Sequence, residues 1–480
     1  MKNCIAQPRR LFFLFQYALI VLLLGACAGP DLSTGHDYPG DTERGGFLSL
    51  FLNLQEEQSP PVRMELRAIE VLADPGSWQP LTPGTTFIDA RTIAGGQIFL
   101  ARGLLQPGNY SRIRLLLKES SLLHQDGLAA LAVEQDAIEL ALPSSLYLDA
   151  GDSHSLFLTW DVSASLQDGP SLNPVLRIAP RLKKMIADAA YVSCPEINTV
   201  FMIRTDRNRV YDSMGVSDRP MYLFSSPVAP EENLFALTVS QPGIKRIGPS
   251  VNSVIESYRL PMTGEATHMT LDPDGRLAYI VDGERGTVMR MNLESGHVEE
   301  RVRLGYGPVY ILYLEKRNLL AVSLTLSQNV ALLDPDTLAN IGMISTGSRP
   351  AGMMVLNDLL YIAEEGGNSV LVYDLERNRM WKRIPVDFSP RRILAADGYI
   401  YVSNYDSRSI SLLRPGQLGV TRNIPLPGAP LELAYVSTSR WIYVGNEGNN
   451  SISVIDPATS TVAGHIPLGA RPGGIAVINR

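Results

Sequence analysis

The sequence repeats itself from about residue 188 to its C-terminus, and this repetition restricts the possible fold more than any other feature of the chain. Six short segments share one pattern, in which a strand-like start is followed nine residues later by an apolar residue. The segments start at Tyr191, Tyr279, Ala321, Tyr361, Tyr401 and Tyr443, and the matching residues are Val200, Val288, Val330, Val370, Ile410 and Ile452. Six agreements at one offset indicate a structural repeat.

A second marker, a proline beside a turn, recurs in the same units. The prolines are Pro220, Pro308, Pro350, Pro390, Pro430 and Pro472, and Ala266 takes the place of one. Their spacing of 40 to 46 residues predicts seven units between residues 188 and 480. Four short strands per unit of about 42 residues are typical of a β-propeller blade. We therefore predict an all-β, seven-bladed propeller; a parallel β-helix or a chain of independent β-domains is the alternative.

The two ends of the repeat region predict how the ring closes. Residues 472–478 match the innermost strand of the other units, and no outer strands follow them. The first unit, in contrast, begins at Tyr191 without an innermost strand. We expect the C-terminal strand to complete the first blade, because this pairing removes a free edge. The unit near Ala236 matches poorly, and an insertion around residues 241–251 is expected to delay its third strand to Asn252-Ser253-Val254.

The tetrapeptide Tyr401-Val402-Ser403-Asn404 resembles the one that names the YVTN family of β-propeller repeats. The resemblance covers residues 191–480 and rests on the recurrence of the motif. It implies a propeller fold and leaves the chemistry open, because seven-bladed propellers include lactonases, quinone-dependent dehydrogenases and haem-dependent reductases.

The first 26 residues predict export. Basic residues precede an apolar run over residues 11–24, which is shorter than the roughly 20 residues of a membrane span and fits a secretory signal. Leu24-Gly25-Ala26-Cys27 resembles the lipobox of bacterial lipoproteins, which implies that Cys27 carries acyl chains that attach the protein to a membrane. The alternative is an ordinary signal with an incidental cysteine. Ala28 in the place of an aspartate favours the outer over the inner membrane of a Gram-negative cell envelope.

Two further segments separate this signal from the propeller. Residues 27–45 are polar and rich in Gly, Pro and Asp, which predicts a flexible tether. Residues 46–187 contain short strand patterns between turn signals, which predicts a β-sandwich. The motif at residues 105–115 and the Trp160-Asp161 strand resemble an N-terminal lipoprotein domain of unknown function, and that family implies a sandwich without established chemistry. Strand alternation is expected to place Tyr110, Arg112 and Arg114 on one face.

Charge and cysteine content exclude some partners and sites. The chain has a net charge of −7, and the predicted signal removes further positive residues. We therefore expect no nucleic-acid partner. If Cys4 leaves with the signal and Cys27 is lipidated, Cys194 is the one thiol left, so no intrachain disulfide can form. We interpret Cys194 as a small buried apolar group.

A propeller brings its proline turns and the loops between the second and third strands of each blade to one end of the channel. Arginines beside the prolines and polar residues after the Tyr-Val strands should meet there. The candidate ligand-binding residues are Arg219, Arg349, Arg391, Arg471, Asp282, Glu364, Asn404 and Asn446, with Arg392, Glu196, Glu365 and Glu447 beside them. Arginine and carboxylate together suit a polar or anionic ligand. Alternatively, these groups pair with one another and close the channel.

The sequence predicts no catalytic residue, metal site or cofactor. His268, His297 and His465 fall at different points of their repeats, so we expect them to be core or solvated residues rather than ligands of one metal. Asp272-Pro273-Asp274-Gly275 is interpreted as a hairpin turn rather than a calcium loop. The sequence contains neither a Gly-x-Ser-x-Gly motif nor a phosphate-binding loop.

These observations favour a lipid-anchored envelope or surface protein whose propeller is a non-catalytic binding or scaffold module for a protein, peptide or glycan. The alternative is a lactonase-like hydrolase or lyase acting at the channel mouth, and a third hypothesis is a subunit of an envelope assembly. A broad apolar patch on the propeller would favour a partner, whereas carboxylates with perturbed pKa values around a metal would favour an enzyme.

Overall fold

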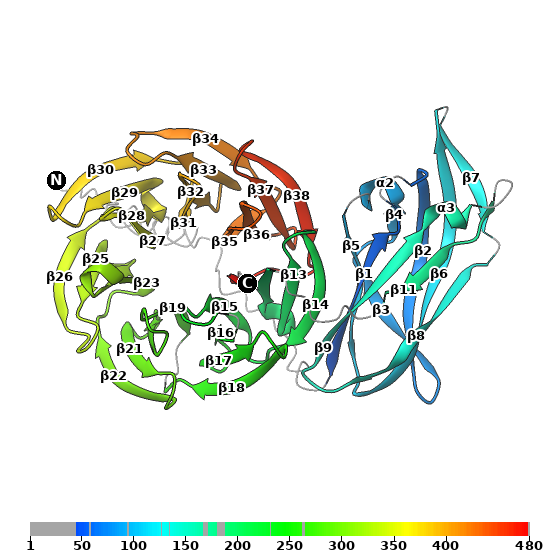
Figure 1. The fold of residues 1–480 in the computed structure, drawn as a ribbon, viewed down its shortest axis with the longest axis horizontal. Coiled ribbons are helices and arrows are strands. Elements are labelled where there is room, and N and C mark those ends of the chain that lie inside the picture. Colours follow the sequence, from blue (N-terminus) through cyan, green and yellow to red (C-terminus); the bar gives the residue numbers. More distant parts are fainter. Residues whose placement is uncertain are drawn as a thin grey trace, which may run out of the picture. The chain divides into compact units, whose positions relative to one another are not determined.

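The computed structural model describes residues 45–56, 59–93, 96–125, 127–133, 135–166, 171–179, 188–230, 232–261 and 265–478. All of them belong to one compact unit, Thr42–Arg480, and nearly all regular structure in it is β (Figure 1). The predicted signal peptide, Cys27 and the tether up to residue 44 lie outside the described residues. Within the described ranges, no helix has the length and apolar character needed to cross a membrane.

A sheet of 11 strands precedes the propeller. Its order is β10-β7-β6-β2-β3-β5-β1-β9-β11, with β4 paired to β2 and β8 paired to β6. The elements are β1 (Gly46–Leu54), β2 (Val62–Ala73), β3 (Ser77–Pro83), β4 (Phe87–Asp89), α2 (Ala90–Ile93), β5 (Ile98–Leu105), β6 (Gly108–His124), β7 (Gly127–Val133), β8 (Ala137–Leu148), β9 (Ser153–Asp161), α3 (Val162–Ser165), β10 (Ser171–Leu172) and β11 (Val175–Ile178).

The all-β character of this region is confirmed, but the two stacked sheets of the expected sandwich are not shown. The strands instead form one curved sheet, a half-barrel. Strand β6 has 17 residues and pairs with β2, β7 and β8 along its length, so that one hydrogen-bonded sheet continues where a sandwich would divide. A single apolar core that includes Tyr110 and Trp160 packs against it.

The expectation that Tyr110, Arg112 and Arg114 share a face is wrong. The pairing of β6 with β8 shifts register between Tyr110 and Arg112, so a β-bulge interrupts the alternation. Tyr110 is therefore buried with Ile113, and its hydroxyl donates a hydrogen bond of 2.7 Å to the carbonyl oxygen of Gln106. Arg112, in contrast, is exposed to solvent.

Seven antiparallel sheets of four strands form the ring of the propeller (Figure 1). Blade 1 contains β12 (Ala189–Cys194), β13 (Thr199–Arg204), β14 (Arg209–Gly215) and β39 (Ile475–Ile478), and blade 2 contains β15 (Pro220–Ser225), β16 (Leu234–Thr238), β17 (Gly243–Gly248) and β18 (Ser253–Arg259). Blade 3 contains β19 (Ala266–Leu271), β20 (Leu277–Asp282), β21 (Thr287–Asn292) and β22 (His297–Arg303), and blade 4 contains β23 (Pro308–Leu314), β24 (Leu319–Leu324), β25 (Asn329–Leu333) and β26 (Asn340–Ser345).

The remaining blades follow in the same order. Blade 5 contains β27 (Pro350–Leu356), β28 (Leu359–Glu364), β29 (Ser369–Asp374) and β30 (Arg379–Pro385), and blade 6 contains β31 (Pro390–Ala396), β32 (Tyr399–Asn404), β33 (Ser409–Leu413) and β34 (Val420–Pro425). Blade 7 contains β35 (Ala429–Val436), β36 (Trp441–Glu447), β37 (Ser451–Asp456) and β38 (Thr461–Pro467). Three single-turn 3₁₀ helices, η2 (Pro195–Ile197), η3 (Glu315–Arg317) and η4 (Glu365–Gly367), lie in loops between strands.

The predicted closure of the ring is confirmed. Strand β39 pairs antiparallel with β12, from Ala189 opposite Ile478 to Val192 opposite Ile475. The last strand of the chain is therefore the innermost strand of blade 1, and each blade has four strands. Ile478 is fully buried by this pairing.

The recurrent Tyr-Val segments are the second strands of their blades, and their tyrosines pack between neighbouring blades. Tyr443 of blade 7, for example, is fully buried against residues of blade 1, and its hydroxyl donates a hydrogen bond to Asn208. Tyr191 of blade 1 is likewise buried against blade 2. The repeat therefore reflects the packing of each blade on the next one.

The expected insertion in blade 2 is wrong. Leu237 pairs with Ile244, just as Val281 pairs with Val288 in blade 3, so β17 is an ordinary third strand. Phe235 occupies the tyrosine position, and Ile244 follows it at the same interval of nine residues. The pattern escaped notice because phenylalanine replaces tyrosine, and Ser253 belongs to the fourth strand instead.

Several side chains of the N-terminal sheet contact blades 1 and 7 within the compact unit. Phe51 of β1 meets Phe201 of β13 edge to face, with ring centres 5.9 Å apart. The Arg102 guanidinium donates hydrogen bonds to the carbonyl oxygens of Leu468 and Gly469 at 2.8 and 3.0 Å. Cys194 is fully buried in the same apolar cluster, and burial raises the pKa of its thiol to about 12, as expected for an inert core cysteine.

Candidate functional site

The loops of the blades form two ends of the propeller. Pro308 at the start of β23 pairs with Leu324 at the end of β24, so the proline turns and the loops between second and third strands share one end. We call it the proline end. The loops between first and second strands and the loops between third and fourth strands lie at the other end. We call this the hairpin end.

Three of the four predicted arginines join one cluster at the proline end. We call it the arginine cluster, and its members are Arg349, Glu365, Arg391, Tyr405, Glu447 and Arg471. One Glu365 carboxylate holds two arginines, with Arg349 Nη2 at 3.1 Å and Arg391 Nε at 3.0 Å. The guanidinium carbon of Arg391 lies 3.6 Å from the centre of the Tyr405 ring, which is a close cation–π contact.

The second half of the cluster continues from this ring. The Tyr405 hydroxyl donates a hydrogen bond to Glu447, whose carboxylate lies 2.9 Å from Arg471 Nε. The contacts therefore run from the loop before blade 5 to the loop before the last strand of the chain. Because three arginines face two glutamates, the cluster keeps one excess positive charge. In this geometry the arginines and glutamates pair with one another, which is the alternative to ligand binding that the sequence leaves open.

Five of the eight predicted residues do not join the cluster. Asp282, Glu364, Asn404 and Asn446 lie at the ends of second strands and have no exposed surface. Asn404 Nδ2 donates to Ser411 Oγ at 2.9 Å within blade 6, and Asn446 Nδ2 makes the equivalent bond to Ser453 Oγ at 2.8 Å in blade 7. These amides connect second and third strands. Arg219 lies in the loop between blades 1 and 2, where its backbone N–H donates to Asn198 Oδ1 at 2.9 Å.

Glu364 is an internal anchor of blade 5. Its carboxylate accepts hydrogen bonds from Arg383 Nε, Ser369 Oγ and the Gly347 N–H, each at 2.6 Å. Burial acts to raise the pKa of Glu364, but these donors and the Arg383 charge outweigh it and hold the pKa below its ordinary value. Glu364 is therefore an ionised structural group, while Glu365 beside it enters the arginine cluster.

Large apolar side chains surround the arginine cluster at the proline end. Tyr306 is 64% exposed, Leu326 is 77% exposed and Phe388 is 65% exposed, although each could bury substantial apolar area. The Leu326 N–H donates to the Tyr306 carbonyl oxygen at 3.0 Å, so these two loops touch. Together with Arg349 and Arg391, these residues define what we call the aromatic–arginine face. Sequence reasoning missed its apolar members because single loop residues carry no periodic signal.

The loops that carry this face form a continuous series. Thr325, beside Leu326, donates its hydroxyl to the Pro350 carbonyl oxygen at 3.2 Å, which joins the blade 4 loop to the turn of Arg349. The Phe388 N–H donates to Ser407 Oγ at 2.8 Å, which joins its turn to the loop of Tyr405. The apolar and arginine residues therefore lie on one connected surface of blades 4 to 6.

Five side chains meet inside the channel, each two positions after the proline of its blade or, in blade 3, after Ala266 in its place. We call them the channel layer: Tyr222, His268, Tyr310, Arg392 and Glu432, with Gly352 and Gly474 at the two remaining positions. His268 stacks on Tyr310 with ring centres 3.9 Å apart. The Arg392 guanidinium lies 5.8 Å from the Tyr222 ring centre and 5.2 Å from that of Tyr310. Side chains from blades 2, 3, 4 and 6 thus meet across the ring.

The charges of the channel layer are balanced. Arg392 Nε lies 3.1 Å from Glu432 Oε2, and although burial opposes the charge, Glu432 raises the pKa of Arg392 and keeps it cationic. Burial, together with the Arg392 charge, lowers the pKa of His268 well below its usual value, so the imidazole is neutral. His268 Nδ1 is buried without a hydrogen-bond partner among the described residues.

The three histidines of the propeller do not meet. His297 is exposed on β22, and His465 Nδ1 lies 3.1 Å from Ser453 Oγ in blade 7. The sequence predicts each histidine to be either a core or a solvated residue. His268 is buried, but it lies in the channel rather than in an apolar core. Its register relative to the proline position is the signal that could have found it.

Asp272 caps the hairpin between β19 and β20, as predicted. Its Oδ1 accepts hydrogen bonds from the backbone N–H groups of Arg276 and Leu277 at 2.7 and 2.8 Å. No group of three or more His, Cys, Asp or Glu side chains in the described part of the chain is placed to hold a metal ion.

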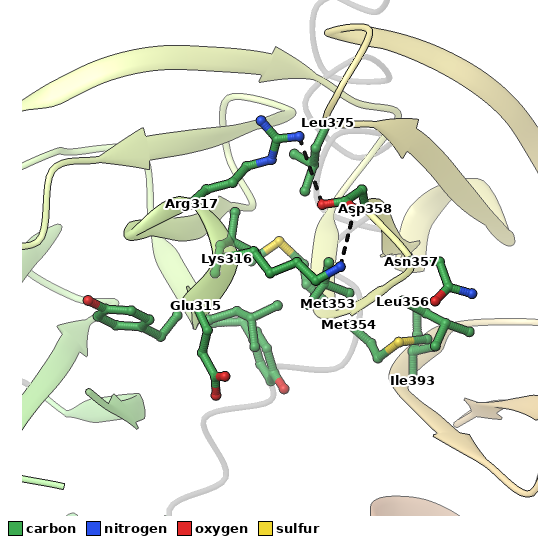
Figure 2. A pocket seen from close by; sticks show the side chains of 15 residues that line it. Glu315, Lys316, Arg317, Met353, Met354, Leu356, Asn357, Asp358, Leu375 and Ile393 are labelled. Atoms are coloured by element: carbon green, nitrogen blue, oxygen red, sulfur yellow. Dashed lines mark hydrogen bonds and ion pairs between the residues drawn. The ribbon is translucent and has the colours of Figure 1, made fainter. Parts of the chain in front are cut away.

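A cavity of about 550 Å³ opens at the hairpin end between blades 4 and 5 (Figure 2). Apolar side chains, including Met353, Met354 and Ile393, line its interior, and Tyr310 of the channel layer contributes to its wall. Lys316 and Asp358 lie at its mouth. Sequence reasoning placed no site at this end.

Comparison with solved structures finds similar chains. A protein of unknown function from Desulfotomaculum acetoxidans is 13% identical with a TM-score of 0.54, over 61% of this chain and 99% of that one. A dihydro-heme d1 dehydrogenase is 12% identical with a TM-score of 0.48, over 60% and 65% of the two chains. The Cps50 (Swd1) β-propeller domain of Myceliophteria thermophila is 11% identical with a TM-score of 0.46, over 53% and 88%. At 13% identity, the likeness to the Desulfotomaculum acetoxidans protein shows the fold alone.

The sequence matches no protein-family model and no curated protein. The resemblances to the YVTN family and to the lipoprotein domain therefore stay predictions, whereas the seven-bladed fold is shown.

Proposed function

We propose that this chain is a non-catalytic binding module whose aromatic–arginine face holds a segment of a partner protein. The observation that carries the proposal is the exposure of Tyr306, Leu326 and Phe388 beside an ordered set of arginines. Tyrosine and arginine are enriched among the few residues that carry most of the binding energy in protein interfaces. An apolar patch at this end is the feature that separates partner binding from catalysis among the functions considered for the sequence.

The charges of the face indicate the chemistry of the partner. Arg349 is 58% exposed and shares its carboxylate, Glu365, with a second arginine. An incoming carboxylate can therefore pair with Arg349 while Glu365 keeps Arg391, and it neutralises the excess positive charge of the cluster. We infer that the partner segment carries apolar side chains for Leu326 and Phe388 and an acidic residue for Arg349.

Catalysis at the channel mouth is less well supported. A hydrolase or lyase there needs a carboxylate or other base that is available to the substrate. Glu365 and Glu447 are both engaged by arginines, and Glu447 also accepts the Tyr405 hydroxyl. We therefore favour binding over the lactonase-like alternative.

The N-terminal sequence supports a location for the module. A lipid on Cys27 would tether the propeller to the cell envelope, with the outer membrane favoured by Ala28 in a Gram-negative cell. We propose that the anchored propeller presents its face to a neighbouring envelope or surface protein.

Site-specific photocrosslinking tests the binding face in the full-length protein expressed in its own envelope. A benzophenone amino acid replaces Phe388 or Leu326, and the control replaces Leu418, which is 77% exposed like Leu326 but lies at the hairpin end. We expect the same discrete protein adduct from both face positions and none from position 418. The absence of adducts from the face, or the same adduct from position 418, would contradict the proposal.

A further inference from the structure

The cavity at the hairpin end combines a deep apolar interior with a charged mouth (Figure 2). Its volume of about 550 Å³ falls within the range of small-molecule sites. Met353 is 1% exposed and Ile393 is 8% exposed, so the wall is a continuation of the propeller core. Met353 and Met354 are unbranched and polarisable, and such side chains adapt to apolar ligands of varied shape.

The mouth of the cavity carries two cations and two carboxylates, because Glu315 lines it together with Lys316, Arg317 and Asp358. Asp358 is the one carboxylate shared by two cations, with Lys316 Nζ at 3.3 Å and Arg317 Nη2 at 3.9 Å. Figure 2 shows the Glu315 carboxylate pointing away from this group. The Glu315 side chain also lines a neighbouring cavity of about 410 Å³ in the channel mouth, where Asp272 lies beside it. On the side of the rim where Lys316 and Arg317 lie, the two cations therefore share one carboxylate.

We propose that this cavity binds an amphipathic small molecule, with its apolar body against Met353, Met354 and Ile393 and its anionic group at Lys316 and Arg317. Both cations have donors beyond those that Asp358 uses, because a lysine has three and an arginine five. A ligand anion can therefore bind beside Asp358 without displacing it. This site lies at the opposite end from the aromatic–arginine face, so neither proposal depends on the other.

Two fluorescent probes with the same ring system separate the two parts of this proposal. 8-Anilino-1-naphthalenesulfonate carries an anionic group, and N-phenyl-1-naphthylamine lacks it. We expect saturable binding of the anionic probe to the folded full-length protein at one site. Lys316→Ala combined with Arg317→Ala should weaken the binding of the anionic probe about tenfold, because its sulfonate loses two partly exposed ion pairs. The affinity for the uncharged probe should not change.

A matched pair of exposed arginines serves as the control. Arg276 and Arg440 also lie in hairpin-end loops, and each pairs with an aspartate, Asp274 or Asp397. Their double replacement by alanine should leave the binding of both probes unchanged. Equal weakening in the control, or no weakening in the Lys316/Arg317 variant, would overturn the assignment of the anion to this mouth.

Filling the cavity tests where the apolar body lies. Met354→Trp should abolish the saturable binding of both probes, since the indole occupies the space beside Ile393. Thermal unfolding of each variant establishes that the fold is intact before the probes are added. If a folded Met354→Trp protein binds both probes as the unchanged protein does, the cavity is not the site.

Discussion

At the scale of single residues, neighbours in sequence have different roles at the proline end. Glu364 is fully buried and bonded within blade 5, whereas Glu365 leaves the strand and holds Arg349 and Arg391. Alternation along β28 directs one side chain into the blade, and the 3₁₀ turn that follows directs the next toward the mouth. A substitution at one position should therefore affect stability, and one at the other should affect binding.

Glu364→Gln should destabilise the propeller at neutral pH by about 2 kcal/mol, because it removes the charge that Arg383 and Ser369 bond. The pKa of Glu364 is depressed in the folded protein, so its stabilisation is complete above its ordinary value of 4.5 and is lost as the pH falls through the folded value. Urea unfolding at neutral pH and well below pH 4.5 should show a difference that shrinks in acid. Glu376→Gln, at an exposed position of the same blade, is the control, and a pH-independent difference would contradict this account.

The arginines of the site could be predicted from sequence because they stand beside prolines in a regular repeat. The sequence could not show that Glu365 and Glu447 pair with these arginines whereas Asp282, Asn404 and Asn446 are buried. All of these polar residues lie at or just after the end of a second strand, and the sequence does not say which of them point to the channel mouth. Apart from Arg392, the channel layer was missed for a different reason. Its members are Tyr, His, Arg and Glu, which share a register but no chemistry.

At the scale of strands, the second and third strands of each blade were the most predictable elements. Their tyrosine and valine positions pack between blades, and this packing imposes one interval of nine residues. Blade 2 satisfies the same packing with Phe235, so a pattern based on tyrosine failed there. The half-barrel depends on the pairing of β6 with β2 and β8 in addition to its hairpin with β7, and no local pattern encodes the pairing with β2.

Removal of residues 472–480 should destabilise the entire propeller, because blade 1 loses β39 and the ring loses its closure. Ile475 and Ile478 are 6% and 0% exposed, and the loss of two such side chains costs about 4 kcal/mol. The thermal midpoint of the truncated protein, compared with one that lacks residues 479–480 alone, measures this effect. Equal midpoints for the two truncations would contradict closure by the last strand.

Gly474 permits the close approach of blades 1 and 2 at the channel layer. A Cβ atom there would lie 2.4 Å from Leu223 N and 2.7 Å from Tyr222 Cα, and neither backbone atom can move freely. We expect Gly474→Ala to cost about 1–3 kcal/mol. Gly464→Ala is the matched control, since its Cβ would meet nothing within 4 Å. Chemical denaturation of both variants decides the point, and two equal stabilities would contradict the close approach.

At the scale of the whole molecule, the channel layer separates two ends with different chemistry. The proline end presents exposed Tyr306, Leu326 and Phe388 around paired arginines. The hairpin end holds an apolar cavity whose rim carries Lys316 and Arg317 beside Asp358. We propose that the ring binds a partner protein at one end and a small molecule at the other, and the N-terminal sequence predicts that it does so while attached to a membrane.

The membrane attachment is tested at Cys27. Replacement of Cys27 by serine should release the protein from the membrane fraction, because the acyl chains that provide the binding energy cannot be added. Fractionation of cells, with detergent release of the unchanged protein as the reference, measures the distribution. A serine variant that remains in the membrane fraction would contradict lipidation at this position.

Equilibrium affinity for the photocaptured partner tests the binding face most directly. The purified partner is titrated against the full-length protein, against Leu326→Ala combined with Phe388→Ala, and against Leu418→Ala. We predict at least about tenfold weaker binding for the double variant and unchanged affinity for the control, because exposed anchors at an interface centre carry most of its energy. Unchanged affinity of a folded double variant, or equal weakening by Leu418→Ala, would contradict the assignment of binding to the aromatic–arginine face.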